Sequence, residues 1–536
     1  MKRKIIKNLM LIGLLGINII SGAGCQKQEL QQDDLQYEET WKNDADDPVE
    51  LSWYINYSWY DTGWGENLVS KKITEETGVS VRFVTPTGSE TGKLEVMMSS
   101  NTLPDMVTLD WHEGRELAGK DMVYALNELA DQYDAYFYKA ANPDVLEWYT
   151  EEDGNIYCYP NSFYTPQDYE NHDDIGSNQN FLVRKDLYEA IGSPDMTTPQ
   201  GFEDAVKKVT EMFPTVNGKP LIPIGADEFH SQGCKSFDEY LQNFLAVPYE
   251  EDGKLYDRYT DKEFIAWLKV FRKLADEGYL ADDIFIDKRA QMAEKFEQGR
   301  YFCMLYQGRD MLDQQKLRYS NDPDSIYIAV EGPRNSDGDN PRLPGAGLNG
   351  WTVTLISKNC RNPERAIAFM SYLISEHGQK RVYLGVEGKT YDMVDNQPVI
   401  IQEVKELLDT DRKEYDRIYG ADDTYWMLQN NILQKQWQQE IPEAERQLKE
   451  WTYPYTIYTG AYDIAFPNGT DEANRWKRIQ EEWGNVLPKL LLSSSEEEFD
   501  QRLQEFLTER EKYSYKELME TATLNMIKIK EKLGLE

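Results

Sequence analysis

The residues after position 48 alternate between short β-branched runs and amphipathic stretches, and this alternation most constrains the fold. In "VSVRFVTP" the side chains of Val79, Val81 and Phe83 occupy every second position, which predicts a strand with one buried face. The preceding "GENLVSKKITEETG" predicts a helix that ends at Gly78. Parallel strands need a crossover connection, which is usually a helix. The strand–helix order therefore predicts an α/β protein.

Similar units recur along the chain of 536 residues, which is too long for one compact core. The predicted strands and helices form two groups, and the chain passes between them near residues 160–180 and again near Tyr306. We therefore expect two α/β lobes joined by a hinge, with a ligand cleft between them and a helical C-terminal region after Ile401. The expected first lobe comprises residues 48–165 and 307–375, and the second comprises 166–306 and 376–536.

The N-terminus predicts export. Residues 1–24 join a basic start to a short apolar run, Leu9 to Ile20, that is too short to span a membrane and is typical of a signal peptide. Small residues precede Cys25, and this end resembles a bacterial lipoprotein signal, which implies a lipid on Cys25. Ordinary secretion with cleavage near Ala23 is the alternative. Residues 25–47 are polar without periodicity, which predicts a flexible tether.

The formal net charge of −37 makes nucleic acid a poor partner, because the chain would repel phosphate backbones. An acidic or phosphorylated ligand would need a local basic patch. The other cysteines, at positions 158, 234, 303 and 360, lack C-x-x-C and His/Cys metal-site spacing, so no metal site is expected from them, although a structural calcium elsewhere stays open. The spacing leaves disulfides and free thiols equally open.

Three glycines in "GAGLNGWTVTLIS" match G-x-G-x-x-G at positions 345, 347 and 350. A dinucleotide site needs a strand before such glycines and a helix after them. Here a loop precedes them and a strand follows, so no nucleotide cofactor is expected. The glycines instead predict a close backbone approach before Trp351. Enzyme signatures such as G-x-S-x-G and H-E-x-x-H are also missing.

Several segments, in this order, resemble extracellular solute-binding proteins of ABC transporters, of the family 1 carbohydrate-binding group. They include "LPDMVTL", "DGNIYCYP", "FLVRKDLYEAIG", "EKFEQGRYFCMLY", "GWTVTLISKNCRNPERAIAFMSYLISEHGQ" and "GVEGKTYDM". The resemblance implies a periplasmic-binding-protein-like fold and a monomeric, non-enzymatic protein without a cofactor. It also implies a lipid-anchored protein on the extracellular face of a Gram-positive cell membrane, whose partners are permease subunits.

Saccharide binding needs aromatic platforms for the apolar ring faces and hydrogen-bonding side chains for the hydroxyls. The candidate residues follow predicted strands or lie in the two crossings, where α/β ligands bind. For the loop aromatics the alternative is a packing cluster, and for Arg184 an ion pair. The candidates are Asn56, Trp59, Tyr60, Trp64, Asp110, Trp111, His112, Tyr164, Arg184, Tyr306, Gln307 and Trp351.

The leading hypothesis is a lipoprotein that captures a small carbohydrate, such as an oligosaccharide, and delivers it to an ABC permease. A surface-anchored carbohydrate-active enzyme is the second hypothesis, because paired carboxylates occur by chance in a chain with 95 acidic residues. A binding protein for a non-sugar polar ligand is the third, because aromatic clefts serve both kinds of ligand.

Overall fold

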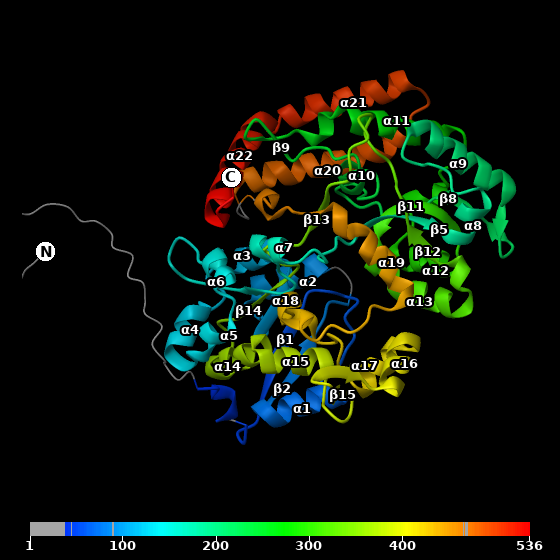
Figure 1. The fold of residues 1–536 in the computed structure, drawn as a ribbon. Coiled ribbons are helices and arrows are strands. Elements are labelled where there is room, and N and C mark those ends of the chain that lie inside the picture. Colours follow the sequence, from blue (N-terminus) through cyan, green and yellow to red (C-terminus); the bar gives the residue numbers. More distant parts are fainter. Residues whose placement is uncertain (1–37, 44, 88–89, 465, 467–469, 536) are drawn as a thin grey trace, which may run out of the picture. The chain divides into compact units, whose positions relative to one another are not determined.

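A five-stranded mixed sheet, called the first sheet here, organises the first part of the chain (Figure 1). The computed structural model describes residues 38–43, 45–87, 90–464, 466 and 470–535. Strand β1 runs parallel to β2 and β3, whereas β14 runs antiparallel to β3 and β4. In sheet order the strands are β2 (Val79–Val84), β1 (Val49–Ile55), β3 (Met106–Leu109), β14 (Val353–Ile356) and β4 (Tyr159–Pro160).

Helices that pack on the first sheet or on each other come from distant parts of the sequence. Helix α14 contacts β14 as well as α4, α5 and α15, and α3 contacts β3 and β14. Gly78 ends α1 with a left-handed φ of 69°, as the sequence predicts. The helices of this part are α1 (Leu68–Thr77), α2 (Glu90–Ser100), α3 (Trp111–Gly119), α4 (Leu126–Tyr133), α5 (Tyr136–Ala140), α6 (Pro143–Tyr149), α14 (Pro363–Ile374), α15 (Glu376–Leu384), α16 (Gln402–Thr410), α17 (Arg412–Ile418) and α18 (Asn431–Lys435).

A four-stranded second sheet organises the next part. Strand β5 runs antiparallel to both β11 and β12, and β8 runs parallel to β11. In sheet order the strands are β12 (Tyr327–Ala329), β5 (Gln179–Arg184), β11 (Tyr301–Gln307) and β8 (Ile222–Ile224). The range 307–375, expected in one lobe, therefore holds a strand of each sheet, because β12 joins the second and β14 the first.

The second sheet is covered by helices from both before and after it in sequence. Thr198 caps α9 by accepting a hydrogen bond from the Gly201 amide at 3.1 Å, and Pro199 is the first helical residue. The helices of this part are α7 (Pro166–Asn171), α8 (Lys185–Ala190), α9 (Pro199–Met212), α10 (Glu239–Phe244), α11 (Lys262–Asp276), α12 (Arg289–Glu297), α13 (Leu312–Asn321), α19 (Glu443–Thr452), α20 (Asp471–Leu491), α21 (Glu496–Glu511) and α22 (Tyr515–Leu533).

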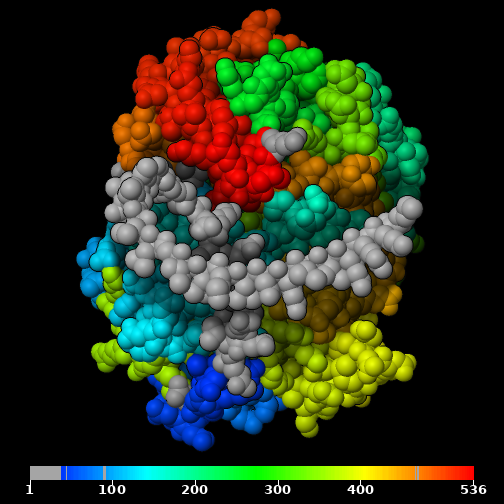
Figure 2. All heavy atoms as spheres, turned by 60° about the vertical axis from the view of Figure 1, so that its left-hand side comes forward, coloured from blue at the N-terminus to red at the C-terminus, as the bar shows by residue number. Residues whose placement is uncertain are grey.

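The C-terminal helices belong to the core of this second part. Helix α20 contacts α11, α21 and α22, and Trp267 of α11 and Trp483 of α20 are each 1% exposed. Helix α22 also contacts the short strand β10 (Lys254–Leu255), which pairs with β9 (Glu250–Glu251). Figure 2 shows the red C-terminal residues beside the green residues of this region, where Lys530 pairs with Glu250 at 2.9 Å.

The remaining strands form small two-stranded pairs. Strand β13 runs parallel to β17, and the other two pairs are antiparallel. These strands are β6 (Thr215–Val216), β7 (Lys219–Pro220), β13 (Leu343–Gly345), β15 (Tyr391–Val394), β16 (Gln397–Ile400) and β17 (Thr456–Tyr458).

The last part of the expected tether is folded. Residues Thr40–Lys42 form a 3₁₀ helix in which Trp41 is only 2% exposed. Its ring meets Tyr136 and Tyr372 edge-on at centroid distances of 4.8 and 5.5 Å. One large aromatic in a polar stretch gives no periodic signal, so its burial was not predicted. The signal peptide and Cys25 lie outside the described residues.

The open question about the cysteines has a simple outcome among the described residues. Cys158, Cys234, Cys303 and Cys360 are free thiols, and all four are buried. The described residues include no cluster of three or more His, Cys, Asp or Glu side chains that could hold a metal ion. In the same part of the chain, no helix has the length and apolar character needed to cross a membrane.

Candidate ligand-binding site

Four aromatic side chains, Tyr57, Trp59, Trp351 and Trp426, gather at one end of the first sheet; we call them the aromatic surface. The rings of Trp59 and Trp351 lie within 7° of parallel, with centroids 6.1 Å apart. Trp426 lies 4.5 Å from Trp351, and Tyr57 lies 5.3 Å from Trp351. The four rings therefore form one continuous cluster.

The backbone of the first sheet brings these rings together. Tyr57 and Trp59 follow the carboxyl end of β1, and Trp351 precedes β14, which is antiparallel to β3 and so begins at the same sheet edge. Trp426 comes from a 3₁₀ turn, Trp426–Leu428, that contacts β14. The carboxyl ends of parallel strands are where ligands of open α/β sheets bind.

The three glycines permit the close approach that the sequence predicts. A side chain on Gly345 would collide with the Tyr169 hydroxyl, and one on Gly350, where φ is 66°, with the Asn161 carbonyl. Asn161 in turn accepts hydrogen bonds from the Trp351 and Thr352 amides, at 3.2 and 2.8 Å. The glycines thus fix the start of β14 against the first crossing, and Trp351 projects from this fixed point.

Exposure divides the aromatic surface into an outer and an inner layer. Trp59 is 55% exposed and Trp351 is 45% exposed, whereas Trp426 is only 9% exposed. The Trp426 indole N–H has no hydrogen-bond partner among the described residues. Two adjacent, half-exposed tryptophans form an apolar patch of the kind that marks interaction sites.

Three of the predicted residues in the same loop point inward. Tyr60 is 4% exposed, and the indole N–H of Trp64 donates to Thr74 Oγ1 at 2.9 Å while its ring packs 4.8 Å from that of Tyr425. Asn56 is buried and donates to Glu113 Oε2 at 2.9 Å. For Tyr60 and Trp64 these contacts match the packing alternative.

Asp110, Trp111 and His112 follow β3 at the same sheet edge. Asp110 caps α3 by accepting a hydrogen bond from the His112 amide at 2.9 Å. The rings of Trp111 and His112 stack with centroids 4.0 Å apart, and Arg115 lies over Trp111. Burial lowers the pKa of His112, although the charge of Asp110 opposes this effect, so the imidazole is held towards its neutral form.

Two predicted residues come from the end of β11. Tyr306 is buried, and its hydroxyl has no partner in the described part of the chain. Burial and then the charge of Asp310 raise its pKa. The Gln307 side chain lies between the Asp310 carboxylate and the Tyr240 hydroxyl, at 3.0–3.1 Å from each once its amide is oriented to donate to the carboxylate. Tyr306 and Gln307 belong to the second sheet, Asp310 to the turn after β11 and Tyr240 to α10.

The other two predicted residues have different surroundings. Tyr164 lies in the first crossing, with its ring 6.0 Å from that of Tyr169. Arg184 lies at the far end of β5 from Gln307, because β5 and β11 are antiparallel and Gln307 pairs with Gln179. Its guanidinium donates to Asp186 at 2.6 and 2.8 Å and to the Gly299 carbonyl at 2.6 Å. Arg184 therefore forms the ion pair that was expected as the alternative to ligand binding. It lies away from the end of β11 that carries Gln307.

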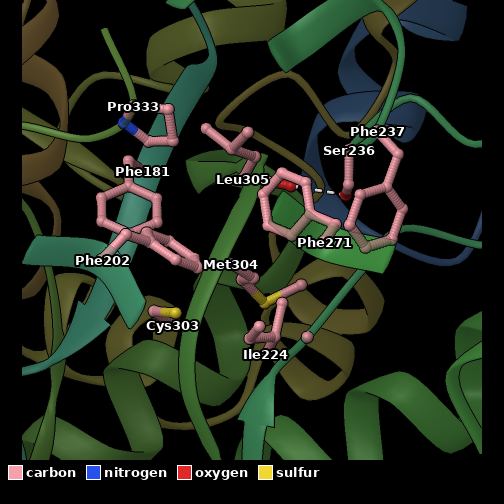
Figure 3. A pocket seen from close by; sticks show the side chains of 11 residues that line it. Phe181, Phe202, Ile224, Ser236, Phe237, Phe271, Cys303, Met304, Leu305 and Pro333 are labelled. Carbon is pink, nitrogen blue, oxygen red and sulfur yellow. Dashed lines mark hydrogen bonds between the residues drawn. The ribbon is translucent and has the colours of Figure 1, made fainter. Parts of the chain in front are cut away.

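Two hollows differ in what they can hold. The cavity in Figure 3 lies in the core of the second sheet between Phe181, Phe202 and Phe271, and its volume of about 10 Å³ is close to that of a single water. Ser236 donates to the Leu305 carbonyl beside it at 2.6 Å. A hollow of about 320 Å³ lies between α2 and α3, where Glu113, the partner of Asn56, is part of the lining. The second has the size of a ligand pocket, unlike the cavity in Figure 3.

Sequence reasoning missed Trp426, which completes the aromatic surface. It lies in "DDTYWMLQN", within a region that the sequence marks only as mostly helical. The one available signal was the adjacent pair Tyr425–Trp426 in a stretch without helical periodicity. Tyr57 was part of the predicted aromatic loop but was not among the candidate residues.

Comparisons with known proteins place this fold and surface in context. The family model described as "Bacterial extracellular solute-binding protein" matches residues 69–388, more than half of the chain. The lipoprotein LipO of Bacillus subtilis is 23% identical over 221 residues, which make up 40% of this chain and 44% of that protein. The chain thus matches less than half the length of this relative.

Solved structures resemble nearly the whole protein. The Streptococcus pneumoniae ABC-transporter substrate-binding protein FusA, in complex with kestose, has a TM-score of 0.69 at 15% identity, with 90% of this chain and 99% of that one covered. The alginate-binding protein AlgQ2 has a TM-score of 0.66 at 18% identity, with 89% and 98% covered. An HMO-binding solute-binding protein from Bifidobacterium longum infantis has a TM-score of 0.63 at 12% identity, with 90% and 99% covered.

The α/β, periplasmic-binding-protein-like fold expected from the sequence is therefore confirmed, with two mixed sheets. The family match also decides against the enzyme hypothesis, because the family consists of binding proteins. The chain belongs to the bacterial extracellular solute-binding protein family.

Proposed function

We propose that this protein captures an oligosaccharide outside the cell and delivers it to the permease of an ABC importer, while a lipid on Cys25 holds it at the membrane. The observation that carries the proposal is the pair of half-exposed, nearly parallel rings of Trp59 and Trp351. Sugar rings have apolar faces, and covering an exposed indole with such a face removes apolar surface from water.

Polar groups near the aromatic surface suit the hydroxyl rim of a sugar. Asp110 and His112 lie at the start of α3, at the sheet edge from which Tyr57 and Trp59 also extend. A carboxylate accepts hydrogen bonds and a neutral imidazole both donates and accepts, so these groups fit hydroxyls, which do both. The similar structures support a saccharide, since FusA was solved in complex with kestose.

The anchor and the delivery step rest on relatives. The matched Bacillus relative is named a lipoprotein, which supports a lipid on Cys25. FusA is named an ABC-transporter protein, which supports a permease as the partner.

A glycan panel tests the binding step. The mature protein is screened by thermal shift against neutral and acidic oligosaccharides and against amino acids and short peptides. We expect a saccharide to raise the melting temperature, and the double variant Trp59→Ala/Trp351→Ala to lose this shift while staying folded. The proposal is overturned if only peptides or amino acids stabilise the protein, or if the double variant keeps the full saccharide response.

A further inference from the structure

A basic pair lies where the second sheet meets the crossing segments. Arg309 belongs to a 3₁₀ turn, Gly308–Met311, directly after β11, and Lys449 lies in the last turn of α19. The turn and α19 are in contact, because a Cβ on Gly308 would lie 3.6 Å from Leu448 Cβ. Asn180 of β5 also donates a hydrogen bond to the Leu448 carbonyl at 3.0 Å. Arg309 follows Gly308 and Lys449 follows Leu448 in the chain, so both cationic residues are next to the residues that make this contact.

Neither cation is neutralised within the described part of the chain. The Arg309 guanidinium and the Lys449 ammonium have no ion pair or side-chain hydrogen bond there, although 95 acidic residues are available in the sequence. The nearby Asp174 pairs with Lys435 instead, at 2.5 Å. Burial, and then the charge of Arg309, lower the pKa of Lys449, although Glu445 and Asp174 oppose this effect. Two cations without an ion pair therefore lie together in a strongly acidic protein.

Asp423, a buried carboxylate whose pKa the charge of Arg309 lowers, makes its hydrogen bonds to other residues. Asp423 accepts hydrogen bonds from Gln434 and Gln429, both at 2.8 Å, and burial raises its pKa to about 7. A carboxyl group that is partly neutral near pH 7 offsets little of a guanidinium charge. Asp423 therefore leaves Arg309 available.

Hydrogen bonds connect this region to the aromatic surface. Gln429 accepts a hydrogen bond from Ser162 Oγ at 3.1 Å, and the preceding residue, Asn161, donates to the Trp426 carbonyl at 3.2 Å. Asn161 also anchors the Trp351 amide. The predicted site residue Tyr164 follows on the same crossing, and Arg309 is close enough to lower its pKa, against the larger raising effect of burial.

We propose that Arg309 and Lys449 form a subsite for an oxyanion carried by the saccharide: a carboxylate, a sulfate or a phosphate. An arginine fork beside a lysine point charge is suited to such a group, because charge-assisted hydrogen bonds are the strong ones. This inference rests on the proposed function, whose aromatic surface takes the sugar rings. The subsite supplies the local basic patch that an acidic ligand needs in order to bind to this acidic protein.

Calorimetric titration tests the subsite with trigalacturonic acid, a sulfated heparin disaccharide and glucose 6-phosphate, which separate the three oxyanions, and with neutral maltotriose and kestose. We expect at least one anionic probe to bind more tightly than the neutral ones. Arg309→Gln and Lys449→Gln should each weaken that binding about 10- to 100-fold, the usual range for a hydrogen bond to a charged group. The affinity of either variant for the neutral saccharides should change less than about 2-fold. Raising the salt concentration should weaken the binding of the anionic probe and leave the binding of the neutral ones unchanged.

Arg82→Gln is the matched control, because it removes the same charge from an exposed residue paired with Glu50 at 3.3 Å. It should leave every affinity unchanged. If neutral saccharides bind but no anionic probe binds more tightly, or if the two variants weaken both kinds equally, the subsite is refuted and the proposed function stands. If no saccharide of either kind binds, the proposed function itself fails, and the subsite with it.

Discussion

Replacing Trp351 with alanine separates a binding role from a packing role. The side chain is 45% exposed, and a tryptophan presents about 150–250 Å² of surface. Roughly 70–110 Å² is therefore available to a ligand, and covering it at about 25 cal/mol per Å² contributes about 2–3 kcal/mol. A sugar that covers only one ring face recovers less, so we expect about 1–3 kcal/mol, or about 5- to 150-fold weaker binding.

The effect on folding should be smaller than for a core tryptophan. About half of the Trp351 surface is already in water, so we expect the variant to lose roughly 1–2 kcal/mol of unfolding free energy, against about 3–5 for a buried tryptophan. Trp267→Ala, at a residue 1% exposed in the core of the second sheet, is the matched comparison. Affinity is measured by calorimetry and stability by denaturant unfolding. Intact affinity with a loss of stability as large as that of Trp267→Ala would refute the binding role.

Three further predictions concern other parts of the chain. Cys25→Ala should release the protein into the medium or leave it unprocessed, and equal membrane retention without a lipid on Cys25, measured by fractionation and mass spectrometry, would contradict the anchor. Trp41→Ala should cost about 3–5 kcal/mol of unfolding free energy, because the ring is 2% exposed, and should speed proteolysis near residue 40; an unchanged denaturation midpoint would show that the segment does not pack. The raised pKa of Asp423, about 7, means that the folded protein keeps a proton that the unfolded chain releases near pH 4, so stability should fall as pH rises from about 4 to 7 and then level off. The overall negative charge acts in the same direction, so Asp423→Asn, compared by denaturant unfolding at several pH values, should flatten part of this fall; identical profiles would contradict the assignment.

The fold was predictable where periodicity and capping carry it. The alternation in β2 and the Gly78 end of α1 are local signals, and the structure confirms both. The antiparallel insertion of β14 between β3 and β4 was not predictable, because strand direction depends on contacts between residues about 200 positions apart.

The candidate site was predictable only in part, for the same reason. Loop position identified Trp59 and Trp351, but it could not tell that Trp64 turns inward to Thr74. Trp426 reaches the aromatic surface from the C-terminal third of the sequence, where no strand end marked it. The basic pair was equally hidden, because Arg309 and Lys449 become neighbours only through the contact between the turn after β11 and α19.

The central claim, that saccharide binds on the aromatic surface, is tested most directly by ¹⁹F NMR of protein labelled with 5-fluorotryptophan. The sequence has 13 tryptophans, and single Trp→Phe variants assign the resonances. On titration with a saccharide that stabilises the protein, we predict shifts of the Trp59, Trp351 and Trp426 resonances, while those of the core residues Trp267 and Trp483 stay in place. Saturating saccharide that leaves the Trp59 and Trp351 resonances unmoved would contradict the account.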